Sequence, residues 1–241
     1  MNDKPYFHLY EERYKRLREQ GIEDWIHKPQ ELTDTFKAID EFLSYAHSQP
    51  SRTSIIELGC GQGHLAEHLL EKGFRYFGID ISETAIQQAR KKTGEKGKNA
   101  FLLADITDLQ QIHDNSYDVA IDNQCFHMLI TNKHRNKYLT EIKRILKKDS
   151  NVFFHENFQL NEFDTNILNL QQFNKAFTDD QKTPANYTAY VDGKKRIIEL
   201  PTLPARANNE EGYRKELNKA GFKVEYFQRI MTMCIIYARA I

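Results

Sequence analysis

The stretch IIELGCGQGHL, residues 55–65, places three glycines at alternate positions between a short apolar run and the start of a second one. Glycine inside a strand or a helix costs conformational entropy, so a cluster of glycines needs a reason in the backbone. A turn from a strand into a helix supplies that reason, because unpaired helix amides face a ligand there and side chains would block its approach. The stretch therefore predicts a ligand-binding turn at Gly59, Gly61 and Gly63.

The residues around this turn alternate between short apolar runs and amphipathic runs. Strands are predicted at 54–58, 75–79, 100–104, 117–121 and 151–156. Helices are predicted over 64–72, from Ser82 as the N-cap, and around 138–146, the last one ending in Lys147 and Lys148. This alternation is typical of a doubly wound α/β fold, in which helices cover both faces of a parallel sheet.

The flanking segments complete one predicted domain over residues 1–241. Apolar residues at helical spacing predict two N-terminal helices, within a segment 1–50 that can act as a lid. Residues 51–157 form the ligand-binding core, and 158–207 read as a cap inserted between the fifth and sixth strands, with a hairpin at 187–200 turning at Asp192-Gly193. Residues 208–241 supply a helix closed by Gly221 and two final strands.

Composition excludes several classes of protein. The chain has 34 basic and 34 acidic residues, so its charge gives no reason to expect a nucleic-acid partner. It has no run of 18 apolar residues, and its charged, aromatic start lacks the apolar core of a secretory signal. Cys60, Cys125 and Cys234 are widely spaced, which suits reduced thiols better than a disulfide frame or a zinc site. We expect a cytoplasmic monomer or homodimer without a metal or a membrane partner.

Two acidic residues help to decide which nucleotide the turn binds. Asp80 follows the first glycine by about 20 residues, where a carboxylate can accept hydrogen bonds from both ribose hydroxyls. The spacing G-x-G-x-G differs from the G-x-G-x-x-G of dinucleotide folds. Glu57 would repel a pyrophosphate but suits a cationic or zwitterionic ligand. The residues therefore favour a cationic nucleoside over NAD.

Four motifs follow one another in this core: ELGCGQG, FGIDIS, LLADIT and YDVAIDNQCFHML, which cover roughly residues 54–157. In this order they resemble the successive motifs of class I S-adenosylmethionine-dependent methyltransferases. The resemblance implies S-adenosyl-L-methionine as the cofactor, S-adenosyl-L-homocysteine as the product, and a seven-stranded, mostly parallel sheet whose last strand is antiparallel. LKKDSN, residues 146–151, departs from the Pro-Gly-Gly turn that usually precedes the fifth strand.

The resemblance also implies a role for each matching residue. The turn around the methionine moiety would comprise Glu57, Gly59, Cys60, Gly61 and Gly63. The nucleoside would contact Asp80 through its ribose, Ile81 through the face of adenine, Asp105 through the adenine amino group and the backbone of Ile106 through the ring edge. The methionine amino group would contact Asp122 and Asn123, and His127 matches a histidine common after that strand.

Methyl transfer asks little of protein side chains. An in-line displacement on a sulfonium gains much of its rate from positioning and desolvation, so a base is needed only for poor nucleophiles. Acceptor contacts are expected at the carboxyl ends of the fourth and fifth strands, from Asn123, Gln124, His127, His155, Glu156 and Asn157. Among these, His127, His155 and Glu156 are the candidates for a catalytic base. The alternatives are a structural contact for His127 and loop capping for residues 155–157.

Aromatic residues outside the core are candidates for a lid and for acceptor contacts. They are Tyr6, Phe7, Tyr10, Tyr14, Trp25 and, in the insertion, Tyr187. The alternative for the N-terminal helix is an amphipathic helix that buries its aromatic face.

The sequence predicts methyl transfer to an N, O or S atom of a small molecule. The alternatives are a non-catalytic S-adenosylmethionine sensor, a methyltransferase acting on a protein or RNA, and a nucleotide-linked dehydrogenase.

Overall fold

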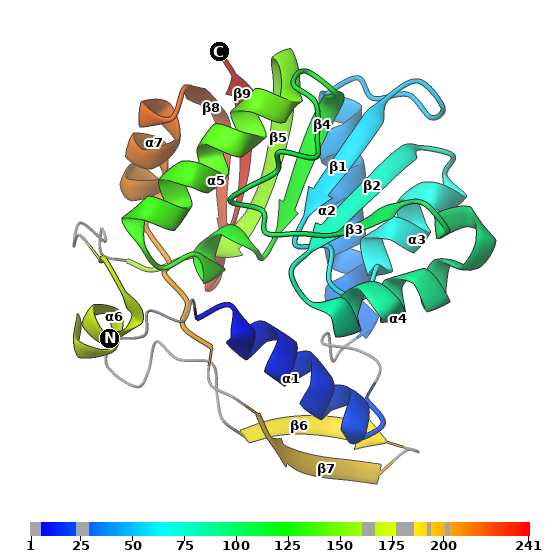
Figure 1. Cartoon of the computed structure of the whole chain (residues 1–241). Helices are drawn as coiled ribbons and strands as arrows, with labels where there is room; N and C mark the ends of the chain where they lie inside the picture. The colour runs from blue at the N-terminus through cyan, green and yellow to red at the C-terminus, as the bar shows by residue number, and fades with distance from the viewer. Residues whose placement is uncertain (1–5, 23–28, 161–166, 177–185, 192–193, 201–202) are drawn as a thin grey trace.

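A seven-stranded sheet forms the centre of the computed structural model (Figure 1), which describes all residues except 1–5, 23–28, 161–166, 177–185, 192–193 and 201–202. For residues 29–31, 175–176, 186–191 and 194 it describes the backbone alone. The strands are β1 (Ser54–Leu58), β2 (Arg75–Asp80), β3 (Phe101–Leu103), β4 (Tyr117–Asn123), β5 (Leu146–Asn157), β8 (Phe222–Ile230) and β9 (Met233–Ala240). Their order is β3-β2-β1-β4-β5-β9-β8, and β9 runs antiparallel to both of its neighbours. The predicted sheet, with its last strand antiparallel, is confirmed.

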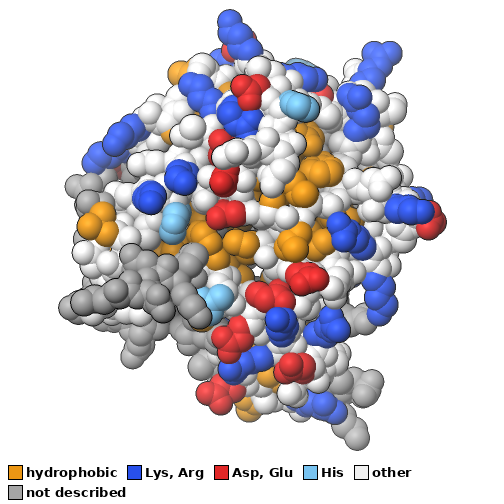
Figure 2. Space-filling model, viewed as in Figure 1, with side chains coloured by type: hydrophobic (Ala, Val, Ile, Leu, Met, Phe, Trp, Pro, Cys, Tyr) orange, Lys and Arg blue, Asp and Glu red, His pale blue; other side chains and the backbone are white. Residues whose placement is uncertain are grey.

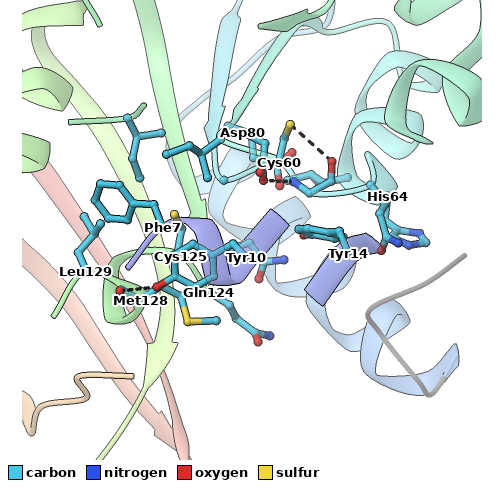
Figure 3. Close-up of a pocket in the computed structure, with 18 of the residues that line it drawn as sticks. Phe7, Tyr10, Tyr14, Cys60, His64, Asp80, Gln124, Cys125, Met128 and Leu129 are labelled. Atoms are coloured by element: carbon cyan, nitrogen blue, oxygen red, sulfur yellow. Dashed lines mark hydrogen bonds between the residues drawn. The ribbon is translucent and has the colours of Figure 1, made fainter. Parts of the chain in front are cut away.

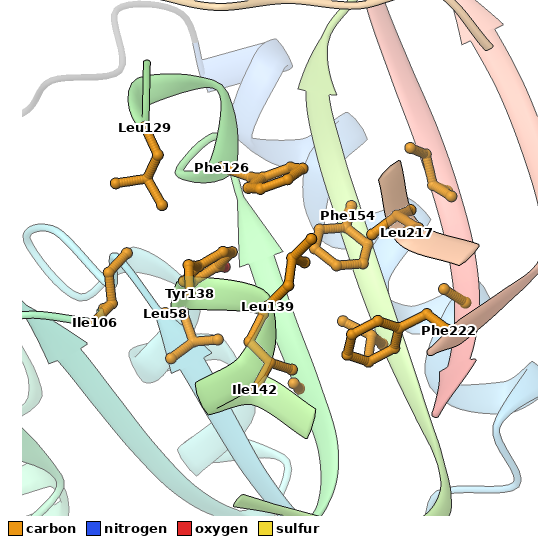
Figure 4. Packing of buried hydrophobic residues seen from close by; sticks show 14 of the residues in the cluster. Leu58, Ile106, Phe126, Leu129, Tyr138, Leu139, Ile142, Phe154, Leu217 and Phe222 are labelled. Atoms are coloured by element: carbon orange, nitrogen blue, oxygen red, sulfur yellow. The ribbon is translucent and has the colours of Figure 1, made fainter. Parts of the chain in front are cut away.

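Helices cover both faces of this sheet. The first face packs against α2 (Pro29–Tyr45), α3 (His64–Glu71) and α4 (Glu83–Thr93), and the second against α5 (Asn132–Ile145) and α7 (Glu210–Lys219). Figure 4 shows side chains of α5 and α7 packed against β1 and β5 in the second layer. Within β1, Ile55 belongs to the first core, whereas Ile56 and Leu58 belong to the second. Burial on both faces explains why the strand is a continuous apolar run.

Side-chain caps fix where three of these helices begin. The Ser82 hydroxyl accepts the Ala85 N–H at 3.0 Å and starts α4, as predicted. Thr131 and Asn209 cap α5 and α7 in the same way. A short 3-10 helix, η1 (Gly94–Gly97), follows α4, and a second one, η2 (Phe126–Met128), follows β4.

The predicted end of α5 at Lys147 and Lys148 is wrong. The helix ends at Ile145, because Leu146 is extended, buried and paired with Tyr117, so that β5 begins at once. Lys147 instead places its ammonium 2.5 Å from an Asp118 carboxyl oxygen. Burial of Leu146 therefore outweighs the favourable placement of two lysines at a helix end.

The N-terminal helix and the insertion lie beyond the carboxyl edge of the sheet. Figure 1 shows α1 (His8–Glu19) below this edge, with the hairpin of β6 (Asn186–Val191) and β7 (Lys194–Glu199) below α1. Antiparallel pairing confirms the predicted hairpin, although its turn lies outside the described residues. A third apolar cluster joins α1 to β7 and contains Leu17, Ile22, Ile198 and Leu200. The insertion also contains α6 (Leu170–Ala176), and within the described residues no helix has both the length and the hydrophobicity to cross a bilayer.

Candidate active site

A cavity opens at the carboxyl ends of β1, β2 and β4, beside α1 (Figure 3). Parallel α/β sheets bind their ligands at this edge. The predicted residues on the cavity wall are Tyr10, Tyr14, Glu57, Gly59, Cys60, Gly61, Asp80, Ile81, Asp105, Ile106, Asn123 and Gln124. The wall also contains Phe7, a candidate for the lid. The wall residues that the sequence did not single out for the site are Leu32, Phe36, Gln62, His64, Leu65, Cys125, Met128 and Leu129.

The glycine turn requires glycine for two separate reasons. Gly59, Gly61 and Gly63 have φ values of 77°, 50° and 78°, in the left-handed region that side chains disfavour. A Cβ on Gly59 would lie 2.5 Å from the Cys125 sulfur, and one on Gly61 would lie 2.8 Å from the Tyr14 hydroxyl. Gly63 lies off the cavity wall, where it begins α3 and packs against α4. Both the backbone conformation and the neighbouring residues therefore exclude a side chain at these turn positions.

Asp80 links this turn to the start of α4. One carboxyl oxygen accepts the Gly61 N–H and the other accepts the Ser82 N–H, both at 2.8 Å. Burial raises the pKa of Asp80 to about 6, although the backbone N–H donors favour the ionised form. Each carboxylate oxygen can accept a further hydrogen bond, so Asp80 retains the capacity to hold ribose hydroxyls.

Glu57 adds a second buried carboxyl beneath the cavity. It lies on β1 and accepts a hydrogen bond from the Tyr76 hydroxyl. Burial raises the pKa of Glu57 to about 8, and the carboxyls of Asp80 and Asp122 act in the same direction. A cationic ligand would favour the ionised form of Glu57, whereas a pyrophosphate would favour the neutral form and gain no charge attraction from it. These buried carboxyls fit the zwitterionic, cationic S-adenosylmethionine better than a dinucleotide.

The predicted adenine contacts lie together on the same wall. Ile81 follows β2, and Asp105 and Ile106 follow β3. The Thr107 N–H donates to an Asp105 carboxyl oxygen at 2.8 Å and thereby fixes that side chain at the wall. The structure thus brings the methionine, ribose and adenine candidates to a single cavity.

Asn123 and Gln124 supply polar groups at the end of β4. The Asn123 side-chain oxygen lies 2.9 Å from His155 Nδ1, and the Gln124 N–H donates to the His155 carbonyl at 2.8 Å. Burial lowers the pKa of His155 to about 4, so this ring is neutral at pH 7. His155 therefore supports Asn123 from behind the wall.

Three other predicted site residues meet in a buried cluster behind the wall. The Asp122 carboxyl accepts the Cys125 N–H at 2.8 Å, and the Glu156 carboxyl accepts the His127 N–H at 2.8 Å and lies 2.6 Å from His127 Nδ1. The sequence predicted a methionine contact for Asp122 and base roles for His127 and Glu156. These roles do not match the placement, because all three side chains are buried behind the wall and the two carboxyls already accept backbone N–H groups. Asn157 also lies off the wall, and its carbonyl accepts a hydrogen bond from Tyr213.

The first helix is bonded to both sides of the cavity. The Tyr10 hydroxyl donates to the Met128 carbonyl at 2.8 Å. On the other side, Glu11 accepts hydrogen bonds from the hydroxyls of Ser82 and Thr84 at 2.6 and 2.9 Å. The helix thus buries its aromatic face and covers the cavity at the same time.

The remaining aromatic candidates lie elsewhere. Tyr6 is buried behind the wall, where its hydroxyl accepts the Ile130 N–H at 3.1 Å. Trp25 lies outside the described residues, and for Tyr187 the structure describes only the backbone. Among the wall residues that the sequence did not single out for the site, Gln62 and His64 neighbour the glycine turn, whereas Leu32 and Phe36 had only the helical spacing of core residues.

Comparisons with known proteins identify the family of this chain. A family model described as a methyltransferase domain matches residues 56–154. An uncharacterized methyltransferase of Schizosaccharomyces pombe is 33% identical over 101 residues, which cover 42% of this chain and 68% of that protein. The eEF1A lysine and N-terminal methyltransferase of Mus musculus is 27% identical over 104 residues, which cover 40% of this chain and 15% of that protein.

The similarity to solved methyltransferase structures extends over the whole chain. The crystal structure of Burkholderia thailandensis 1,6-didemethyltoxoflavin-N1-methyltransferase, with bound 1,6-didemethyltoxoflavin and S-adenosylhomocysteine, superposes with a TM-score of 0.63 at 15% identity. The match covers 100% of this chain and 91% of that one. A glycine turn flanked by Glu57 and Asp80, the seven-stranded sheet and these relatives agree, and the chain belongs to the class I S-adenosylmethionine-dependent methyltransferases.

Proposed function

We propose that this enzyme transfers the methyl group of S-adenosylmethionine to an N, O or S atom of a small molecule. The observation that carries this proposal is the covered, apolar wall of the cavity away from Asp80. Figure 3 shows Phe7, Tyr10, Met128 and Leu129 gathered there, with Cys125 between them and the cofactor turn. Such a wall suits a compact acceptor that is largely enclosed when bound.

The chain's own residues would bind and orient the two reactants. The bound cofactor supplies a methyl group already activated on a sulfonium. Glu57 and the glycine turn would hold the methionine end, and Asp80 and Asp105 would hold the nucleoside. The aromatic wall would exclude water and align the acceptor for an in-line displacement. Positioning is thus the main contribution asked of the protein.

Two further features support a small acceptor. Tyr10 and Glu11 bind α1 to opposite sides of the cavity, so a folded protein or an RNA would have to displace the helix. Figure 2 shows Lys, Arg, Asp and Glu interspersed on one face of the molecule, and the net charge is zero. This mixture gives little attraction for a polyanion. The proposal includes a cytoplasmic location, since Cys60, Cys125 and Cys234 are free thiols.

A protein acceptor is the second candidate. It is favoured by the mouse relative, whose name describes a lysine and N-terminal methyltransferase. That match covers 40% of this chain, so it supports a shared cofactor core and leaves the acceptor side open. We place it second because α1 covers the cavity.

Radiolabelled methyl transfer separates these candidates. The protein would be incubated with methyl-labelled S-adenosylmethionine and, separately, a panel of small thiols, amines, carboxylic acids and phenols, an RNA fraction or a protein extract. We expect label in the low-mass fraction, with an equal amount of S-adenosylhomocysteine released. Label in protein or RNA would replace the proposal by the corresponding alternative. Cofactor binding without turnover on any acceptor would favour a sensor, and preferential binding of NAD would overturn the cofactor assignment.

A further inference from the structure

We call the apolar part of the cavity wall, which is proposed to contact the acceptor, the acceptor wall. The turn that follows β4 presents three of its residues, Cys125, Met128 and Leu129. Its backbone is held from two directions. The Arg135 guanidinium donates to the carbonyls of Phe126 and Leu129 at 2.9 and 3.1 Å. The amide side of the same turn faces the carboxyls of Asp122 and Glu156, which lie at the ends of the paired strands β4 and β5.

We propose that Asp122 and Glu156 are positioning residues, a carboxyl pair that must share one proton to hold the acceptor wall in its working shape. The pair accepts three consecutive backbone N–H groups. Cys125 donates to Asp122 at 2.8 Å, Phe126 donates to both carboxyls at 3.3 Å, and His127 donates to Glu156 at 2.8 Å. Because both carboxyls lie 3.3 Å from the same Phe126 nitrogen and both are fully buried, ionisation of one opposes ionisation of the other.

The groups around the pair do not supply a positive charge for the second carboxylate, so a shared proton has to compensate that charge. Arg135 is a cation that acts on Glu156, but its guanidinium makes a bidentate pair with Glu216, with both N–O distances at 2.7 Å. Burial lowers the pKa of His127 to about 4, so this ring is neutral near pH 7. The other titratable groups that act on the pair are Glu57 on β1, Cys125 after β4, Tyr138 on α5, Tyr213 on α7 and Cys234 on β9. None of these described groups carries a positive charge.

Both carboxyls are fully buried, and burial together with the neighbouring carboxyl raises the pKa of Asp122. Burial also raises the pKa of Glu156, and the titration belongs to the pair as a unit. Loss of the shared proton at higher pH would leave two buried negative charges in contact, which repel each other. The turn would then lose its fixed position. Movement would reach the site directly, because Cys125 packs against Gly59 and the Met128 carbonyl holds Tyr10.

The test is the pH dependence of wild type and Glu156→Gln. The amide oxygen can still accept the His127 N–H, Asp122 still accepts the Phe126 N–H, and the amide NH2 can donate to Asp122 without a titrating proton. In ¹⁵N-labelled protein we expect the amide signals of Phe126 and His127 to shift together above neutral pH, and Glu156→Gln to abolish that step. Glu95→Gln, whose side chain is 91% exposed in the wild type, is the matched control and should retain the step. An identical step in Glu156→Gln, or no step in wild type, would overturn the proposal.

Kinetics provide a second measurement that rests on the proposed function. With an acceptor found in the labelling panel, wild-type kcat/KM should fall by about tenfold per pH unit above the pKa of the pair, and Glu156→Gln should lack this fall. Asp122→Asn should behave in the same way, which covers the case that Glu156→Gln fails to fold. A fall that persists in both folded variants would contradict a positioning role. The amide titration needs no acceptor, so it distinguishes failure of this proposal from failure of the proposed function.

Discussion

Replacing Asp80 by alanine should weaken cofactor binding and destabilise the protein for separate structural reasons. The carboxyl accepts the buried N–H of Ser82 and the half-buried N–H of Gly61, and each would lose its acceptor. An unsatisfied buried donor costs about 1–3 kcal/mol, so the two together should lower the free energy of unfolding by up to about 2–6 kcal/mol. Loss of the charge-assisted ribose contacts should weaken S-adenosylmethionine binding by about 1–3 kcal/mol, or about 5- to 150-fold in Kd.

Calorimetric titration and urea unfolding separate these two effects. Cofactor affinity would be measured at a temperature at which circular dichroism shows every variant folded. Asp80→Asn should lie between wild type and alanine, because it retains one acceptor oxygen but turns an amide toward a backbone donor. Asp108→Ala, at an exposed position off the cavity wall, is the control and should bind as wild type does. Folded Asp80→Ala protein with unchanged cofactor affinity would refute the ribose assignment.

Two more substitutions test the turn and the helix that covers it. Gly61→Ala should reduce cofactor affinity by about tenfold, since φ is 50° and the new Cβ would lie 2.8 Å from the Tyr14 hydroxyl; calorimetry on Gly61→Ala with and without Tyr14→Phe would show partial recovery in the double variant if the contact contributes. Glu11→Gln should lower stability by about 1 kcal/mol at pH 7 through weaker acceptance from Ser82 and Thr84. Burial alone would raise the pKa of Glu11, but these hydrogen bonds lower it overall, so its contribution is present above the ordinary value of 4.5 and is lost as the pH falls through the lowered pKa. Urea unfolding from pH 7 to pH 3 should therefore show the two proteins converging, and a constant difference would contradict this account.

The features that could be predicted from sequence are those set by residues that are close together in the chain. The glycine turn needs only its own backbone, and a strand buried on both faces is a continuous apolar run wherever it occurs. The ending of α5 was missed because Leu146 gains its burial from pairing with Tyr117, a contact between strands that are distant in sequence. The contact of Glu11 with Ser82, 71 residues away, likewise leaves no local signal.

Asp122 shows the same limit within the site itself. Successive side chains of a strand point to opposite faces, so Asp122 and Asn123 could not both face the cavity in the same way. The sequence placed the two together at the end of a strand but did not indicate which one points into the cavity. The structure places Asn123 on the cavity wall and Asp122 against the turn behind it.

The two sides of the cavity therefore differ in how the sequence specifies them. The cofactor side is built from short motifs after β1, β2 and β3, where neighbours in sequence are also neighbours in space. The proposed acceptor side depends on a turn after β4 that is held by Glu156 from β5, Arg135 from α5 and Tyr10 from α1. Because these supports come from distant segments, substitutions away from the cavity can change the acceptor wall while leaving the cofactor motifs intact.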